Sequence, residues 1–171
     1  MGMFMASVSF RCADREKWTQ LRPWVERMFN DTPELVTNFD EAGPGYVILD
    51  MQGYQIGTLA GLPERISALT GDYAVMAVCN DSDFNLMSLF HNGNCLEKSY
   101  IGEVYEEYNE FLEINEPDIT LWKPLLQDPT RVEDLRHALY AREIFAEHNL
   151  RLLTELIGLP IFDDELFTRY I

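Results

Sequence analysis

Residues 75–101, VMAVCNDSDFNLMSLFHNGNCLEKSYI, constrain the fold of this chain more than any other stretch. Three apolar runs are separated by two short polar turns, Asn80 to Asp83 and His91 to Asn94. The second turn contains Asn92-Gly93, whose residues tolerate the positive φ of a type I′ turn, so it predicts a β-hairpin. The stretch therefore predicts an antiparallel meander of three strands, with the two turns setting the register of the sheet.

The rest of the chain alternates between strand and helix signals. β-branched and aromatic residues predict strands over 4–11 and 46–51, and the polar sequence between them predicts a loop over 30–45. Apolar residues spaced three and four apart predict helices. The first helix starts at Asp14 and has a kink or restart at Pro23. The second lies around Pro63 and stops at Gly71. The remaining helices are predicted over 103–118, 118–122 and 130–158. This order predicts one α+β domain over 1–171, a mostly antiparallel sheet with helices packed on one face and a C-terminal helical part.

The helix predicted over 130–158 has the clearest boundaries. Thr130 with Glu133 matches a capping box, and Gly158 followed by Pro160 supplies a stop. A break is expected near His148-Asn149. The buried stripe of this helix is predicted to consist of Leu135, Leu139, Ile144, Phe145, Leu152, Leu153 and Leu156.

The chain is strongly acidic, because 29 Asp and Glu residues face 13 Lys and Arg residues and the net charge is −16. Such a charge repels phosphate backbones and anionic lipids, so we expect neither nucleic-acid nor membrane partners. A basic protein would be attracted. Neither a G-x-G-x-x-G fingerprint nor a Walker loop occurs, and no cofactor is expected.

The cysteines Cys12, Cys79 and Cys95 lie in or beside apolar runs, with no CxxC spacing and no clustered His to complete a zinc site. We interpret them as reduced thiols of the core, which fits a cytosolic protein. The N-terminus, MGMFMASVSF, lacks the basic start and the apolar length of a secretion signal. No run of about 18 apolar residues is present, so the predicted localisation is cytoplasmic.

Asp81 and Asp83 are candidate ligands of a hard cation such as Mg²⁺ or Ca²⁺, with Asn80 adding an amide oxygen. The alternative is that these residues only shape the turn, since Asp, Asn and Ser side chains bond nearby backbone N–H groups. The EF-hand pattern, with its Gly and distal Glu, is absent. A metal site at this turn therefore requires a third carboxylate from elsewhere in the fold.

The three histidines of the chain are candidate bases for a nucleophile, namely His91, His137 and His148. The available nucleophiles are Cys79, Cys95 and Ser82. No G-x-S-x-G elbow, H-E-x-x-H pair or papain-like context accompanies them. The histidines are explained more simply as one residue beside a turn and two partly exposed helix residues, and no catalytic residue is assigned.

The segment from Glu103 to Asp118 contains seven carboxylates and no Lys or Arg. Its aromatic residues keep helical spacing, which predicts an amphipathic helix with an acidic outer face. Such a face is either only solvated or a docking surface for a basic protein, because charge steers encounter and aromatic side chains supply binding energy. The residues predicted to contact a partner are Glu103, Tyr105, Glu106, Glu107, Tyr108 and Glu110.

Two stretches resemble a family of small bacterial cytosolic proteins. They are the strand-turn-strand pattern around Asp81-Ser82-Asp83 with the Asn-Gly turn that follows, and the C-terminal LLTELIGLPIFDDELFTRYI. The resemblance implies the same kind of domain and brings no activity with it. In size, charge and class the chain is also similar to the immunity proteins that bacteria carry against polymorphic toxins.

Three functions are left open by the sequence. The first is a non-enzymatic cytosolic binding protein, such as an immunity-type protein that neutralises a basic toxin through its acidic surface. The second is a metal-dependent hydrolase that uses Asp81 and Asp83 with further carboxylates. The third is a homodimeric structural module held by the C-terminal helices.

Overall fold

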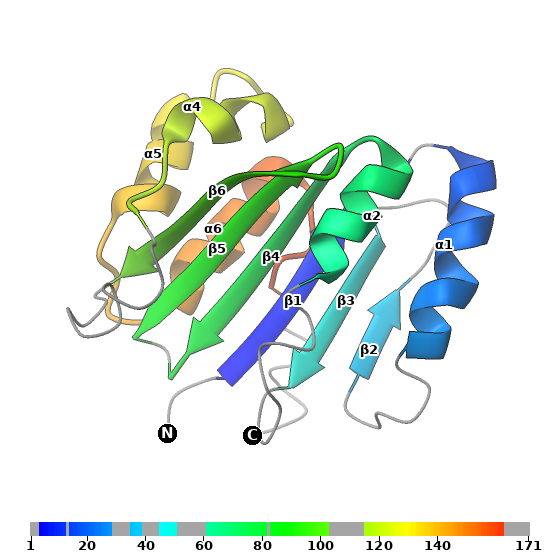
Figure 1. Ribbon diagram of the computed structural model, residues 1–171. Helices are drawn as coiled ribbons and strands as arrows, with labels where there is room; N and C mark the ends of the chain where they lie inside the picture. Colours follow the sequence, from blue (N-terminus) through cyan, green and yellow to red (C-terminus); the bar gives the residue numbers. More distant parts are fainter. Residues whose placement is uncertain are drawn as a thin grey trace.

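The computed structural model describes residues 4–12, 14–28, 35–38, 45–50, 61–81, 83–102 and 115–162. Its centre is a six-stranded sheet in the order β2-β3-β1-β4-β5-β6, and all neighbouring strands are antiparallel (Figure 1). The α+β class is therefore confirmed. The strands are β1 (Phe4–Phe10), β2 (Leu35–Asn38), β3 (Gly45–Asp50), β4 (Tyr73–Asn80), β5 (Phe84–His91) and β6 (Asn94–Gly102).

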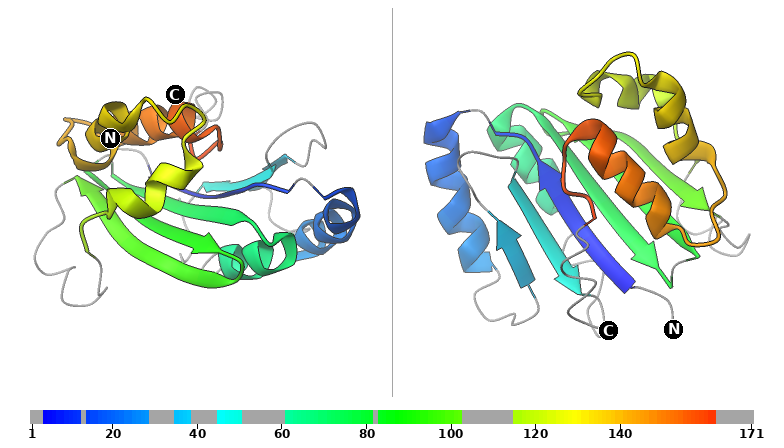
Figure 2. Two further views of the ribbon diagram at one scale, coloured as in Figure 1. Left: turned by 90° about the horizontal axis from the view of Figure 1, so that it is seen from above. Right: turned by 180° about the vertical axis from the view of Figure 1, so that it is seen from behind.

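Helices cover both faces of this sheet (Figure 2). One face carries α1 (Arg15–Met28) and α2 (Leu62–Thr70). The other carries α4 (Ile119–Trp122), the 3₁₀ turn η2 (Lys123–Leu125), α5 (Val132–Tyr140) and α6 (Glu147–Ile157). The C-terminal helices share one face, as predicted, but α1 and α2 cover the opposite face, which corrects the expectation of helices on one face only.

Strand β4 shows why the sheet is covered twice. Its residues 74–79 are all buried. Alternate side chains of a strand point to opposite faces, so Val75, Ala77 and Cys79 join the core under the C-terminal helices. The intervening Ala74, Met76 and Val78 join the core under α1 and α2. A continuous apolar run of this kind is typical of a strand buried on both faces.

Polar side chains of β1 and of Arg11 bind the C-terminal helices and the segment that follows α6 to the centre of the sheet. The hydroxyls of Ser7 and Ser9 and the guanidinium of Arg11, just past the strand, all donate to backbone carbonyls at 2.7–2.8 Å. The accepting carbonyls belong to Ile161 and Pro160 for the serines, and to Leu125 and Ile157 for Arg11. Both serines are fully buried, so these bonds satisfy hydroxyls that would otherwise lack a partner.

Glu97 of β6 joins the C-terminal helices to the last strand of the sheet. One carboxylate oxygen accepts from the indole N–H of Trp122 at 2.7 Å, and the other accepts from the backbone N–H of Asp118 at 2.6 Å. Trp122 is the largest of the fully buried side chains. Because hydrogen bonds to a charged group contribute about 1.5–3 kcal/mol, Glu97 fixes where α4 meets the sheet.

Both predicted turns of the meander are present. In the first, the N–H of Asp83 donates to the carbonyl of Asn80 at 3.0 Å, and Asp81 has a φ of 52°. In the second, Asn92 and Gly93 have φ values of 49° and 78°, as a type I′ hairpin requires. The turn residues therefore set the register of β4 with β5 and of the first residues of β6, as predicted. Between Leu89 and Phe90 the register shifts, so the rest of β6 pairs one residue out of step with the hairpin turn.

Gly93 is expected to be a sensitive position for stability. Its φ is +78°, and an added Cβ atom would lie 2.9 Å from the Cβ of Ala68 on α2. Gly93→Ala should therefore combine backbone strain with a steric clash and lower the free energy of unfolding by about 1–3 kcal/mol, measured by urea denaturation. Ala68→Gly in the same chain removes the clash but not the strain, so the double variant should lose less than the sum of the single losses. Simple additivity would contradict this contact.

Several helix ends lie where the sequence predicted them. Asp14 Oδ1 accepts from the N–H of Glu16 at 2.9 Å at the start of α1. Gly71 and Gly158 end α2 and α6 with left-handed backbone, at φ 69° and 64°. The predicted restart at Pro23 is absent, since α1 runs through this residue. Pro23 is exposed, and burial of the helix's opposite side holds α1 together.

Three expectations about the elements were wrong. The loop predicted over 30–45 contains β2, a short edge strand whose sequence LVTN has no clear alternation. The capping box does not form, because Thr130 donates its N–H and O–H to Asp128 and Arg131 precedes α5. The single helix over 130–158 is divided into α5 and α6 by residues 141–146, earlier than the expected break near His148-Asn149.

Candidate functional site

The β4–β5 turn and the end of β6 lie side by side at one end of the sheet (Figure 1). Phe84 is paired with Gly102, and a Cβ atom on Gly102 would lie 2.7 Å from the carbonyl oxygen of Asp83. Asp81 and Asp83 are both exposed there. We call Asp81, Asp83 and Gly102 the acidic edge, because the glutamate-rich segment of the sequence begins immediately after Gly102.

The six residues predicted to contact a partner lie outside the described residues: Glu103, Tyr105, Glu106, Glu107, Tyr108 and Glu110. The end of the helix predicted over 103–118 is described, and residues 115–117 are not helical. Asn115 instead forms a parallel bridge with Ser99 of β6. Asp118 caps α4 by accepting from the N–H of Thr120, as predicted. The helix prediction is therefore wrong for its last turn, where pairing with β6 prevails.

The acidic surplus is concentrated in the parts of the chain outside the described residues. Those parts hold twelve of the 29 acidic residues and one of the 13 basic residues. Five of the twelve are glutamates of residues 103–114, directly after the acidic edge. The described residues, with 17 acidic and 12 basic side chains, are much closer to balance. Most of the net negative charge is therefore carried by sequence outside the described sheet and helices.

Asp81 and Asp83 lie in the β4–β5 turn, which the backbone N–H of Asp83 closes by donating to the carbonyl of Asn80. The positive φ of Asp81 is one that Asp and Asn adopt more readily than other non-glycine residues. Within the described ranges, no group of three or more His, Cys, Asp and Glu side chains could hold a metal ion. Metal binding by Asp81 and Asp83 stays a prediction, and the described residues do not supply the third carboxylate that it requires.

The three cysteines are free thiols in different surroundings. Cys79 is fully buried in β4, as expected of a core thiol. Cys12 is partly buried, and burial raises its pKa. Cys95 is exposed, so its assignment to the core was wrong. The start of β6 is exposed over residues 94–96, which places Cys95 beyond the cover of the helices.

His91 and His137 each contact the side chain of a neighbouring residue. The ring of His91 lies 4.3 Å from that of Tyr73, centroid to centroid. His137 Nε2 is 3.1 Å from the carboxylate of Glu143, and both His137 and His148 are exposed. These contacts agree with the interpretation of the histidines as turn and helix residues.

The turn between α5 and α6, residues 141–146, exposes apolar side chains. Ile144 is 88% exposed and Phe145 is 50% exposed. Both were predicted to lie in the buried stripe of one long helix, which was wrong because the helix is interrupted here. A signal was present in the sequence: Leu139 and Ile144 are five residues apart, a spacing that puts them on different sides of a helix.

Two buried asparagines hold this turn from behind. Asn149 Nδ2 of α6 donates to the carbonyls of Ala138 and Ala141, each at 3.0 Å. Asn85 Nδ2 of β5 donates to the carbonyl of Ala146 at 2.6 Å. The two asparagines are 2% and 0% exposed. A turn fastened at both ends presents its exposed side chains in a defined arrangement.

The exposed apolar turn lies close to the acidic edge. Asn85, which holds the carbonyl of Ala146, follows Asp83 by two residues and is paired with Ile101, the residue before Gly102. Both views in Figure 2 place the α5–α6 turn beside the strand ends that form the acidic edge. The sequence did not predict the exposure of Ile144 and Phe145.

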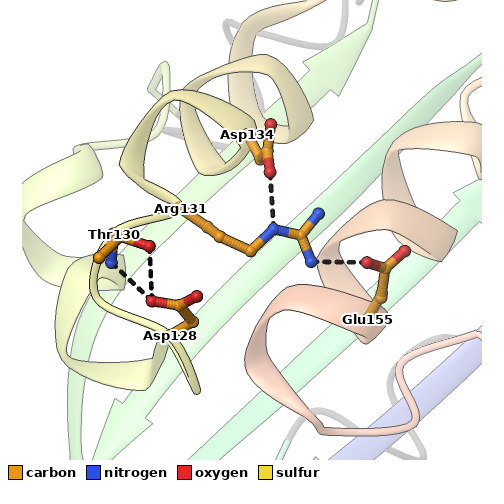
Figure 3. A network of polar contacts seen from close by, with 5 residues as sticks. All are labelled: Asp128, Thr130, Arg131, Asp134 and Glu155. Carbon is orange, nitrogen blue, oxygen red and sulfur yellow. Dashed lines mark hydrogen bonds and ion pairs between the residues drawn. The ribbon is translucent and has the colours of Figure 1, made fainter.

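A separate polar cluster joins the start of α5 to α6 (Figure 3). The guanidinium of Arg131 contacts Glu155 and Asp134, each at 2.6 Å, and hydrogen bonds to these carboxylates raise its pKa. Asp128 accepts from the O–H and the N–H of Thr130, which lowers the pKa of Asp128. The carboxylates and Thr130 are exposed. Every hydrogen bond in the cluster joins two parts of the C-terminal helical layer. We therefore interpret the cluster as a stabilising contact within this layer.

The Asp128–Thr130 arrangement is repeated at Asp118 and Thr120, where the same two hydrogen bonds lower the pKa of Asp118. Thr130→Val removes the O–H and should raise the pKa of Asp128 toward its ordinary value while leaving Asp118 unchanged. Thr120→Val should do the reverse. NMR titration of the carboxyl carbons measures both groups in one sample, and a pKa of Asp128 that Thr130→Val does not move would contradict the assigned cause.

The direction of these shifts also gives the sign of a pH effect on stability. A carboxylate whose folded pKa lies below the unfolded value of about 3.9 stabilises the fold above that pH. The contribution is lost as the pH falls through the lower, folded pKa. The stability difference between wild type and Thr130→Val should therefore shrink below about pH 3.9, whereas a constant difference would contradict the linkage.

In the described part of the chain, no helix combines the length and apolar character needed to cross a membrane. The chain matches no protein-family model, no curated protein and no solved structure. Only its own surface and charge therefore bear on its function.

Proposed function

We propose that this protein is a non-enzymatic cytosolic binding protein that captures a basic protein at its acidic edge. The observation that carries the proposal is the distribution of charge. The net charge is −16, the five glutamates of residues 103–114 follow directly after Gly102 in the sequence, and Gly102 itself lies close to the carbonyl of Asp83. Opposite charge steers two proteins together and raises their association rate, an effect that salt weakens.

The more specific form of the proposal is an immunity-type protein that neutralises a basic toxin. Its size, its α+β class and its acidity support this assignment. A protein that acts by covering another protein needs a firm scaffold with a charged surface, and it needs no reacting group. The fastening of the C-terminal segment by Ser7, Ser9 and Arg11 gives the sheet such firmness.

Capture from a lysate of the source organism at two salt concentrations tests the proposal. Immobilisation through Cys95, in a Cys12→Ser background, leaves the acidic edge free, because exposed Cys95 lies near the opposite end of β6 from Gly102. A basic protein should be retained in about 0.1 M salt and released in about 1 M salt, where the screening length falls from about 10 Å to about 3 Å. Retention of chaperones alone, or retention that salt does not change, would count against the proposal.

A further inference from the structure

We infer that the turn carrying Ile144 and Phe145 is the apolar anchor of the same interface, and that the partner presents an apolar pocket rimmed by Lys and Arg. This inference rests on the proposed function and deepens it. In protein interfaces a few well-packed apolar and aromatic side chains supply most of the binding energy, while charges act mainly on rate and specificity. The acidic edge supplies charge, and the neighbouring turn supplies the apolar contact.

Exposure distinguishes this turn from the rest of the described surface. Ile144 and Phe145 are 88% and 50% exposed, whereas Leu96 and Tyr140, the other exposed large apolar residues among the side chains whose burial the structure describes, are each 39% exposed. Burial of an aliphatic or aromatic side chain of this size is among the largest favourable contributions that one residue makes to binding. A partner that covers both side chains would therefore gain a substantial part of a specific affinity.

The turn is also organised before any partner arrives. Asn85 and Asn149 hold its two ends, and the N–H of His148 donates to the carbonyl of Phe145 at 3.0 Å. The His148 ring meets the Phe145 ring edge-on, with centroids 5.8 Å apart. Because these contacts already order the turn, binding costs less conformational entropy than it would for a loose loop.

Charge decides between two occupants of this turn, a basic protein and a second copy of the chain. Each copy carries a net charge of −16, and a symmetric contact through the turn would bring two acidic edges together. Like charges placed opposite one another oppose association. A basic protein gains from both the apolar contact and the charge, so we assign the turn to a basic partner rather than to a homodimer.

A library of random peptides displayed on phage, selected on the wild-type protein in about 0.1 M salt, tests this inference. The enriched peptides should combine Lys or Arg with a large apolar residue. Their affinity should fall at least about tenfold for the variant Ile144→Ser with Phe145→Ser, because hot-spot side chains contribute more than about 1.4 kcal/mol. Leu96→Ser, at another exposed apolar side chain, is the matched control and should leave the affinity unchanged.

The other outcomes would overturn the inference in distinguishable ways. Basic peptides that bind wild type and the double-serine variant equally would remove the anchor but leave the proposed function standing. Apolar peptides without Lys or Arg would contradict the basic character of the partner. A wild-type dimer in light scattering that the double-serine variant abolishes would assign the turn to a second copy. A selection that enriches nothing would overturn the anchor, while the lysate capture still decides the proposed function separately.

Discussion

Replacing Trp122 by alanine should lower the free energy of unfolding by about 3–5 kcal/mol, the largest stability loss that we expect. Trp122 is 0% exposed and lies in the core under the C-terminal helices. Its indole N–H donates to Glu97 at 2.7 Å. The substitution leaves a cavity and removes a donor from a carboxylate that is half-buried, so packing and hydrogen bonding are lost together. Urea denaturation followed by circular dichroism measures the change.

Two further variants separate these causes. Trp122→Phe keeps an aromatic ring but not the N–H, and we expect a smaller loss, in which the missing hydrogen bond accounts for about 1.5–3 kcal/mol. Leu96→Ala shortens an exposed side chain next to Glu97 and should change stability by no more than about 0.5 kcal/mol. A loss from Trp122→Ala as small as that from Leu96→Ala would contradict the position of Trp122 in the core.

Removing two charges close in sequence to the acidic edge should weaken binding of the basic partner by about tenfold, mainly through slower association. Glu106→Gln with Glu107→Gln removes two of the five glutamates of residues 103–114. A charge pair 4 Å apart contributes about 1 kcal/mol in water and about 4 kcal/mol near a protein surface, and a tenfold change needs about 1.4 kcal/mol. Surface plasmon resonance with the partner identified by lysate capture gives both rate constants.

The matched control changes the net charge by the same amount elsewhere. Glu16→Gln with Glu64→Gln removes two exposed carboxylates from α1 and α2, on the other face of the sheet. This variant should alter the association rate by less than about twofold, because its charges lie on the opposite face of the sheet from the α5–α6 turn and salt screens exposed charges over about 10 Å. Equal losses from the two variants would mean that total charge alone acts, which would contradict a localised acidic edge.

Local chemistry made the meander of β4, β5 and β6 predictable. A type I′ turn needs positive φ at both central residues, and Asn92-Gly93 satisfies this requirement wherever it lies between apolar runs. The caps at Asp14, Gly71 and Gly158 were predictable for the same reason, since each depends on a few neighbouring residues. The acidic surplus of the chain was visible in its composition alone.

Features that depend on distant contacts were not predictable from the sequence. Ser7 and Ser9 resemble the solvent-facing positions of a strand, yet they are buried because carbonyls of the C-terminal segment accept hydrogen bonds from their hydroxyls. Ile144 and Phe145 look like core residues by composition. They are exposed because the side-chain amides of Asn85 and Asn149 hold the chain in a turn there. Neither asparagine belongs to the apolar pattern from which the long helix was predicted.

Zero-length crosslinking of the captured complex tests the central claim most directly. A carbodiimide joins a carboxylate to a lysine amine only when the two groups are in contact, so the linked residues identify the surface that meets the basic partner. We expect crosslinks from Asp81, Asp83 and the glutamates of residues 103–110 to lysines of the partner. Crosslinks confined to Glu16 and Glu64, on the α1 and α2 face, would contradict the assignment of binding to the acidic edge.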